Sequence, residues 1–161
     1  MKKRLWLLLI AMVLIWKAGD VFLKAAPSYD ELLEKNWGIT LPWQAQLTEV
    51  YASDSGSSFH GDGVRCHVFS YKYEHYIDLM FAWAPMEQKT IFYPTSSAAS
   101  EAWLDEIHVP KEWRPEYRKC CSWHQSQPDN SEILIFWDNG ANLLYVIENI
   151  LYGGANGSIP N

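Results

Sequence analysis

The N-terminal segment constrains this chain more than any other part of it. Lys2, Lys3 and Arg4 precede an unbroken apolar run from Leu5 to Trp16. A basic head followed by an apolar core is typical of segments that enter a membrane, and the positive-inside rule keeps such an N-terminus in the cytoplasm. A soluble amphipathic helix would need a polar face, which this run lacks. The remainder of the chain is therefore expected on the far side of a membrane.

The segment permits two interpretations, an uncleaved anchor or a cleaved secretory signal. Apolar character resumes beyond Lys17 and Asp20, so residues 5–23 form a 19-residue stretch. As a helix rising about 1.5 Å per residue, this stretch is long enough to cross a hydrocarbon core of about 30 Å. No small-x-small cleavage site follows the apolar run closely, which favours the anchor. The prediction is a single-pass protein of the cell membrane with an extracytoplasmic domain, and the alternative is secretion after cleavage.

Composition predicts one folded domain behind this segment. Apolar residues make up 48% of the chain and charged residues 20%, which is typical of a globular protein. The last nine residues contain three glycines and a proline and are expected to be a loose tail. The predicted parts are a basic N-terminus (1–4), an anchor or signal (5–23), a linker (24–30), a globular domain (31–152) and a flexible tail (153–161).

The charge of the domain argues against several partners. The chain has 13 basic and 19 acidic residues, of which residues 1–27 hold five basic residues and one acidic residue. Residues 28–161 therefore hold eight basic and eighteen acidic residues, a net charge of −10. Such a domain is repelled by nucleic-acid phosphates, so DNA or RNA binding is not expected. Anionic lipid headgroups repel it in the same way, so contact with the membrane is expected through the N-terminal helix alone.

Periodicity and turn residues predict an α+β domain. It is an antiparallel β-sheet of about four or five strands that ends in a β-hairpin, with one or two helices packed against it. The predicted helices are 29–35, capped by Ser28, and 98–107, capped by Ser96 or Ser97. The predicted strands are 45–53, 64–73, 117–124, 132–137 and 142–150, and residues 74–83 are ambiguous. Asn139-Gly140 predicts a tight turn between the last two strands.

Three cysteines stand in this domain, Cys66, Cys120 and Cys121. Outside the cytoplasm a disulfide can form, so Cys66 could pair with Cys120 or Cys121, leaving one thiol over. If the vicinal pair lies in a strand, its side chains point to opposite faces and only one can meet Cys66. The alternative is three buried, unreactive thiols, because free cysteine often serves as a small apolar residue.

His60 and Asp62 are the best candidates for chemistry or ligand binding. They lie between glycines in the connection Asp54–Gly63, where an aspartate could orient a histidine as a base or share a metal with it. A metal site needs three or four ligands, and Asp54, His67 and His124 cannot be placed from sequence. The simpler interpretation is turn chemistry, because both residue types tolerate left-handed geometry. No catalytic residue, metal site or cofactor is therefore assigned.

Tryptophan is frequent, with nine residues. Trp103, Trp113, Trp123 and Trp137 could line a groove for sugars or peptides, but packing against the sheet is the more ordinary role of such side chains.

Three short motifs carry a resemblance that spans most of the chain. GITLP at 38–42, DSGSSFHGDG at 54–63 and the closing IFWDNGANLLYVIEN at 135–149 resemble small, N-terminally anchored exported proteins of Gram-positive bacteria. In that group an FHGDG turn and a closing hairpin recur in this order, although Ser57-Ser58 stands here where glycines are expected. The resemblance implies export and supplies no activity.

Two functional hypotheses follow. The preferred one is a non-enzymatic binding or interaction module, displayed on an anchor, with a possible protein partner at the cell surface. The alternative is a small extracytoplasmic hydrolase or metal-dependent enzyme centred on His60 and Asp62.

Overall fold

The computed structural model describes residues 28–55, 62–85 and 93–151. The chain divides into a unit that ends at Leu41 and a second unit that begins at Pro42. The predicted anchor (5–23) and tail (153–161) lie outside the described residues, and the single domain predicted over 31–152 stays a prediction. Within the described ranges no helix is both long and apolar enough to cross a membrane.

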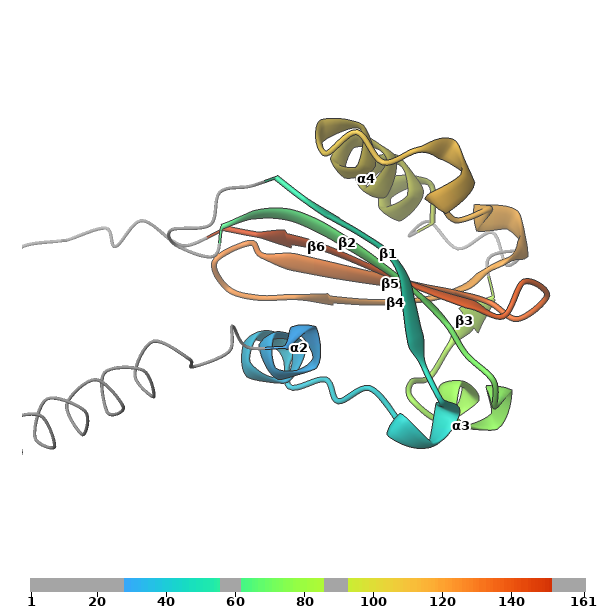
Figure 1. Cartoon of the computed structure of the whole chain (residues 1–161). Helices are drawn as coiled ribbons and strands as arrows, with labels where there is room; N and C mark the ends of the chain where they lie inside the picture. Colours follow the sequence, from blue (N-terminus) through green and yellow to red (C-terminus); the bar gives the residue numbers. More distant parts are fainter. Residues whose placement is uncertain (1–27, 56–61, 86–92, 152–161) are drawn as a thin grey trace, which may run out of the picture. The chain divides into compact units, whose positions relative to one another are not determined.

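The first unit contains helix α2 (Tyr29–Trp37), which confirms the predicted helix and extends it by two residues (Figure 1). The Ser28 hydroxyl accepts the N–H of Glu31, so the predicted cap is also confirmed. The helix ends at Gly38, whose φ of 69° is a left-handed geometry that favours glycine, and the Gly38 N–H donates to the Glu34 carbonyl. Capping residues at both ends thus set the bounds of α2.

The second unit is built on an antiparallel sheet in the order β1-β2-β6-β5-β4-β3 (Figure 1). The strands are β1 (Thr48–Asp54), β2 (Gly63–Ser70), β3 (Ala84–Pro85), β4 (Cys121–Ser126), β5 (Glu132–Asp138) and β6 (Leu143–Ile150). Five strands of six to eight residues and the two-residue β3 confirm the predicted α+β class with an antiparallel sheet. The predicted closing hairpin is the β5–β6 pair, which lies in the middle of the sheet.

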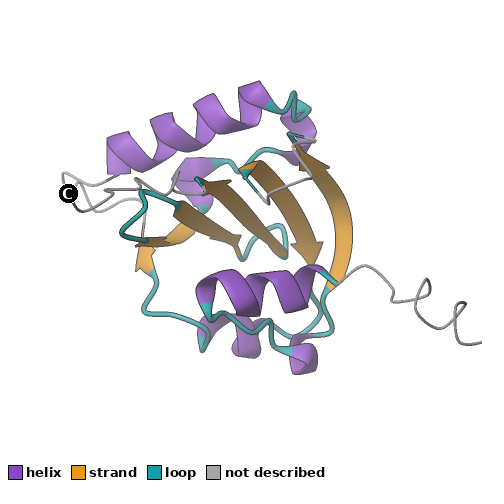
Figure 2. Ribbon diagram, turned by 90° about the vertical axis from the view of Figure 1, so that its left-hand side faces the viewer, coloured by secondary structure: helices purple, strands orange, loops and turns teal. Residues whose placement is uncertain are grey.

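Helix α4 (Tyr93–Glu106) runs across one face of this sheet (Figures 1 and 2). Side chains of alternate strand positions point to that face, because the side-chain period of a strand is two. Leu104 of α4 packs on them, and Phe136 of β5 is fully buried there. This core also contains Val64, Cys66, Val68, Ile107, Val109, Cys120, Leu134, Tyr145 and Ile147.

Most of the tryptophans pack rather than line a common groove. Trp103, a residue of α4, and Trp113 pack against the core beneath that helix. Trp123 and Trp137 lie on the opposite face of the sheet, where Phe81 stacks on Trp123 and Trp83 lies 5.3 Å from Trp137 between ring centroids. The four candidates are therefore divided between two faces, which supports the packing interpretation.

Two predicted strands begin too early. Residues 43–45 form a 3-10 helix, η1 (Trp43–Ala45), so the strand predicted from residue 45 begins at Thr48. Residues 117–119 form another, η3 (Tyr117–Lys119), so the strand predicted from residue 117 begins at Cys121. In both places tertiary packing outweighs the strand preference of apolar and aromatic residues.

Three further local predictions are resolved. The ambiguous stretch contains a short helix, α3 (Glu74–Asp78). Helix α4 begins at Tyr93, so the cap predicted at Ser96 or Ser97 is wrong; Pro94 stands in the first turn, where its missing N–H costs nothing. The turn predicted as tight at Asn139-Gly140 is a loop over residues 139–142, with Asn142 at a φ of 57°.

Candidate functional site

The C-terminal end of α4 is the starting point of the candidate site. His108 has a φ of 54°, and its N–H donates to the Asp105 carbonyl. The N–H of Val109 donates to the Leu104 carbonyl at 2.9 Å, and both side chains are buried in the core. This pair of bonds is a Schellman motif, which reverses the chain after the helix. The reversal brings η2 (Lys111–Trp113) and the residues after it back alongside α4.

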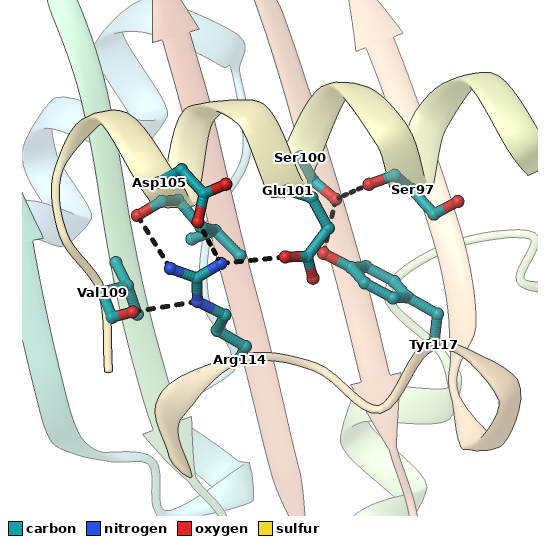
Figure 3. Close-up of polar contacts among 8 residues, drawn as sticks. Ser97, Ser100, Glu101, Asp105, Val109, Arg114 and Tyr117 are labelled. Atoms are coloured by element: carbon teal, nitrogen blue, oxygen red, sulfur yellow. Dashed lines mark hydrogen bonds and ion pairs between the residues drawn. The ribbon is translucent and has the colours of Figure 1, made fainter. Parts of the chain in front are cut away.

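Arg114 ties the returning chain to the helix (Figure 3). Its guanidinium donates to the Glu101 carboxylate at 2.9 Å and to the Asp105 carboxylate at 2.6 Å. It also donates to the carbonyls of Val109 at 2.9 Å and Leu104 at 3.5 Å. A cation at this end complements the helix dipole and satisfies a carbonyl of the last turn. The hydrogen bond with Asp105, ahead of that with Glu101, raises the pKa of Arg114.

Tyr117 of η3 makes a second connection to α4 (Figure 3). Its hydroxyl is hydrogen-bonded to the hydroxyl of the fully buried Ser100, at 2.7 Å, and the Ser100 hydroxyl donates to the Ser97 carbonyl. Its ring meets the ring of Phe136 edge-on, with centroids 5.1 Å apart. Burial raises the pKa of the Tyr117 phenol. Arg114 and Tyr117 together hold residues 111–119 against both the helix and the sheet.

A cleft of about 950 Å³ lies between these segments and the β5–β6 loop. Four acidic and three basic side chains border it, so its charge is mixed. The lining residues are Glu101, Lys111, Glu112, Arg114, Pro115, Glu116, Lys119, Asp138, Gly140, Ala141, Leu143 and Tyr145. Part of this charge is paired within the protein, because Lys119 donates to Glu116 at 2.7 Å and Arg114 is held as described above.

Asp138 and Tyr145 are two buried residues of the lining. Asp138, at the end of β5, is only 6% exposed, and its carboxylate accepts the N–H of Ala141 in the β5–β6 loop. Tyr145 of β6 is also buried, and this burial, with smaller effects of nearby acidic groups, raises the pKa of its phenol to about 12. The buried side of the cleft therefore presents a carboxylate and a protonated phenol, both of which can form hydrogen bonds.

The two vicinal cysteines lie in different surroundings, although only Cys121 belongs to a strand. Cys120 shares the core with Cys66, whereas Cys121 is half-buried at the start of β4. All three cysteines are free thiols in this structure. The disulfide between Cys66 and one of the vicinal cysteines stays a prediction. Burial raises the pKa of Cys66 and of Cys120 to about 12 each. Protonated thiols are poor nucleophiles, so neither group is activated for catalysis.

The structure does not test the pair singled out from sequence. His60 lies outside the described residues, and Asp62 is half-buried immediately before β2. The histidines considered as third members are far apart in the sheet order: His67 of β2 contacts Glu49, and His124 of β4 lies 3.9 Å from Glu132. In the part of the chain that the structure describes, no group of three or more potential ligands is placed to hold a metal ion.

Comparisons with models of protein families, with curated proteins and with solved structures return no match. The function is therefore inferred from the fold, an α+β domain with an antiparallel sheet, and from the geometry of the chain's own residues. The resemblance to exported proteins of Gram-positive bacteria stays a prediction.

The cleft was not predicted from sequence. Glu101 and Asp105 have the spacing of helix neighbours, which is a visible signal of an acidic stripe on 98–107. Nothing in the sequence shows that Arg114 folds back onto that stripe, because the reversal depends on His108 adopting a left-handed geometry, which histidine tolerates but does not require.

Replacing Arg114 by methionine is expected to lower the free energy of unfolding by about 1–2 kcal/mol, since charged hydrogen bonds are lost but the carboxylates stay partly hydrated. Urea unfolding of the purified protein measures this. Lys119→Met is the matched control, because its pair with Glu116 is exposed on both sides and its loss should leave stability nearly unchanged. Equal effects of the two variants would contradict the role given to Arg114.

Proposed function

We propose that this protein is a non-enzymatic binding module, displayed outside the cell on its N-terminal membrane segment or secreted after cleavage, and that the mixed-charge cleft holds a segment of a partner polypeptide. The observation that carries the proposal is the cleft itself, with six charged residues around the buried carboxylate of Asp138. Its volume of about 950 Å³ lies at the upper end of the range typical of ligand sites.

The state of the titratable groups supports binding over catalysis. Nucleophilic catalysis by cysteine or tyrosine requires a lowered pKa or an adjacent base. Burial instead raises the pKa of Cys66 and Cys120 in the core, and of Tyr117 and Tyr145 near the cleft. These groups therefore stay protonated at neutral pH, where they serve packing and hydrogen bonding.

The charge of the cleft indicates the class of ligand. A strongly anionic ligand would meet Glu101, Glu112, Glu116 and Asp138, and a strongly cationic one would meet Lys111, Arg114 and Lys119. A polypeptide segment that carries both signs can satisfy both sets, because complementary charges steer association and fix orientation. Such binding should weaken as salt is added, since exposed charges are screened.

Site-directed photocrosslinking on intact cells tests the proposal. A photoreactive residue at Glu112 or at Ala141, both exposed at the cleft, should yield one discrete crosslinked protein, and less of it at high salt. The matched control is Pro128, which is exposed in the turn at the other end of β5 and should yield no such band. Labelling of Lys111 by an amine reagent that cannot cross membranes reports the location independently.

The outcomes separate location from binding. Labelled Lys111 with a cleft-specific crosslink supports the whole proposal. Labelled Lys111 without a discrete partner, or with equal bands at Pro128, would reject the cleft as a binding site. Absence of labelling on intact cells, with normal labelling after lysis, would reject the extracytoplasmic location.

A further inference from the structure

One corner of the second unit exposes an unusual set of large apolar side chains. The carbonyl of Ala45 in η1 accepts the N–H groups of Lys72 and Tyr73, which brings η1 next to the start of α3. Figure 1 shows these two elements side by side, and contacts between them agree with that view. We call the exposed Trp43, Tyr73, Tyr76 and Leu79 the aromatic corner.

The exposure of the aromatic corner follows from its local geometry. Tyr73, Tyr76 and Leu79 are spaced by three residues, so they follow one side of α3, while Ile77 on the other side is fully buried. Trp43 is 82% exposed and Leu79 67% exposed. Clustered exposed apolar side chains usually mark a surface that another molecule covers.

The charge of this corner differs from that of the rest of the domain. Residues 42–48 carry no charge, and residues 71–84 carry Lys72, Glu74 and Asp78. The two stretches therefore contribute only −1 to the net charge of −10 carried by residues 28–161. The Lys72 ammonium lies 5.3 Å from the centre of the Tyr73 ring. These two stretches therefore add little electrostatic repulsion from an anionic lipid surface.

The sequence also limits how far this corner can be from a membrane. Trp43 follows Leu23, the end of the predicted membrane segment, by 20 residues. At about 3.5 Å per residue, a fully extended chain would separate them by at most roughly 70 Å. Tryptophan and tyrosine are the residues that settle at the level of lipid headgroups, because their rings are apolar and their N–H and O–H groups are polar.

We propose that the aromatic corner docks the domain on the headgroup layer of the same membrane that holds the N-terminal segment, which departs from the expectation, drawn from net charge, that only the N-terminal helix contacts lipid. This inference rests on the membrane anchor of the proposed function. In this arrangement the corner contacts the lipid headgroups. The docking orients the domain in addition to the tether.

Quenching of tryptophan fluorescence by brominated lipid tests the docking on the full chain. The protein is reconstituted into phosphatidylcholine vesicles with or without bromine near the headgroup end of the acyl chains. The contribution of Trp43 is the difference between the wild type and Trp43→Phe. We expect bromine to lower that contribution about twofold. The double variant Tyr73→Ser with Leu79→Ser should remove most of this quenching of Trp43. The matched control is Trp113→Phe, because Trp113 packs beside Tyr51 next to α4 and should not be quenched.

Flotation of the same vesicles separates the two proposals. Protein that floats with the vesicles while its Trp43 contribution is not quenched overturns the docking and leaves the anchor intact. Protein that does not float overturns the anchor, and the docking with it. Shielding of Trp43 that depends on protein concentration and not on bromine would show that a second copy covers the corner, which also overturns lipid docking.

Discussion

Replacing Phe136 by alanine is expected to lower the free energy of unfolding by about 3–5 kcal/mol, the largest effect of any single substitution considered. Phe136 is fully buried at the centre of the sheet and meets the Tyr117 ring edge-on. The substitution removes this contact and leaves a cavity between β5 and η3, which α4 cannot collapse to fill. The midpoint of thermal unfolding should fall by roughly 10–20 °C.

Urea unfolding of the two proteins side by side measures the change. Phe136→Leu serves as the near-isosteric control and should cost no more than about 1.5 kcal/mol. Leu79→Ala, at a largely exposed position, should change stability by less than about 0.5 kcal/mol. A loss below about 1 kcal/mol for Phe136→Ala would mean that the core beneath α4 is not packed as described.

Stability is expected to fall steeply above pH 9. Burial raises the pKa of the Cys66 and Cys120 thiols from 9.0 to about 12, and that of Tyr145 from 10.0 to about 12. Above pH 9 the unfolded chain releases protons that the folded chain retains, so rising pH favours unfolding. The stabilisation is complete below pH 9 and is lost progressively up to about pH 12. Each thiol should contribute a loss of about 1 kcal/mol per pH unit in that window.

Urea midpoints measured from pH 8 to 11 in the presence of a reductant test this dependence. The matched control is the double variant Cys66→Ala and Cys120→Ala, which should lose much of the slope between pH 9 and 10 and keep the part due to tyrosine above it. The same slope in both proteins would show that the thiols titrate in the folded state as they do in the unfolded chain.

Local signals predicted much of the sheet. The apolar runs at 132–137 and 142–150 become β5 and β6, and Ser28 and Gly38 bound α2. Such signals succeed because caps and side-chain alternation act within a few residues of the chain. They failed at residue 45 and at residues 117–119, where 3-10 helices form; Tyr117, for example, is held by Ser100 and Phe136 from other elements.

The candidate sites were much harder to predict. The emphasis on His60 and Asp62 rested on residue types; His60 lies outside the described residues, and Asp62 is half-buried immediately before β2. Arg114 had no distinguishing neighbour in sequence, yet it contacts Glu101 and Asp105 across the chain reversal at His108. Trp43 was one of nine tryptophans, and only its exposure distinguishes it.

The sequence alone determined the α+β class, the antiparallel sheet, the capped helix α2 and the strong negative charge of residues 28–161, because these follow from composition, periodicity and turn residues. Tertiary structure decided which cysteine joins Cys66 in the core, where the charged cleft opens and which aromatic side chains face solvent. These features depend on contacts between segments far apart in the chain. Such contacts arise only when strand pairing and the reversal after α4 bring those segments together.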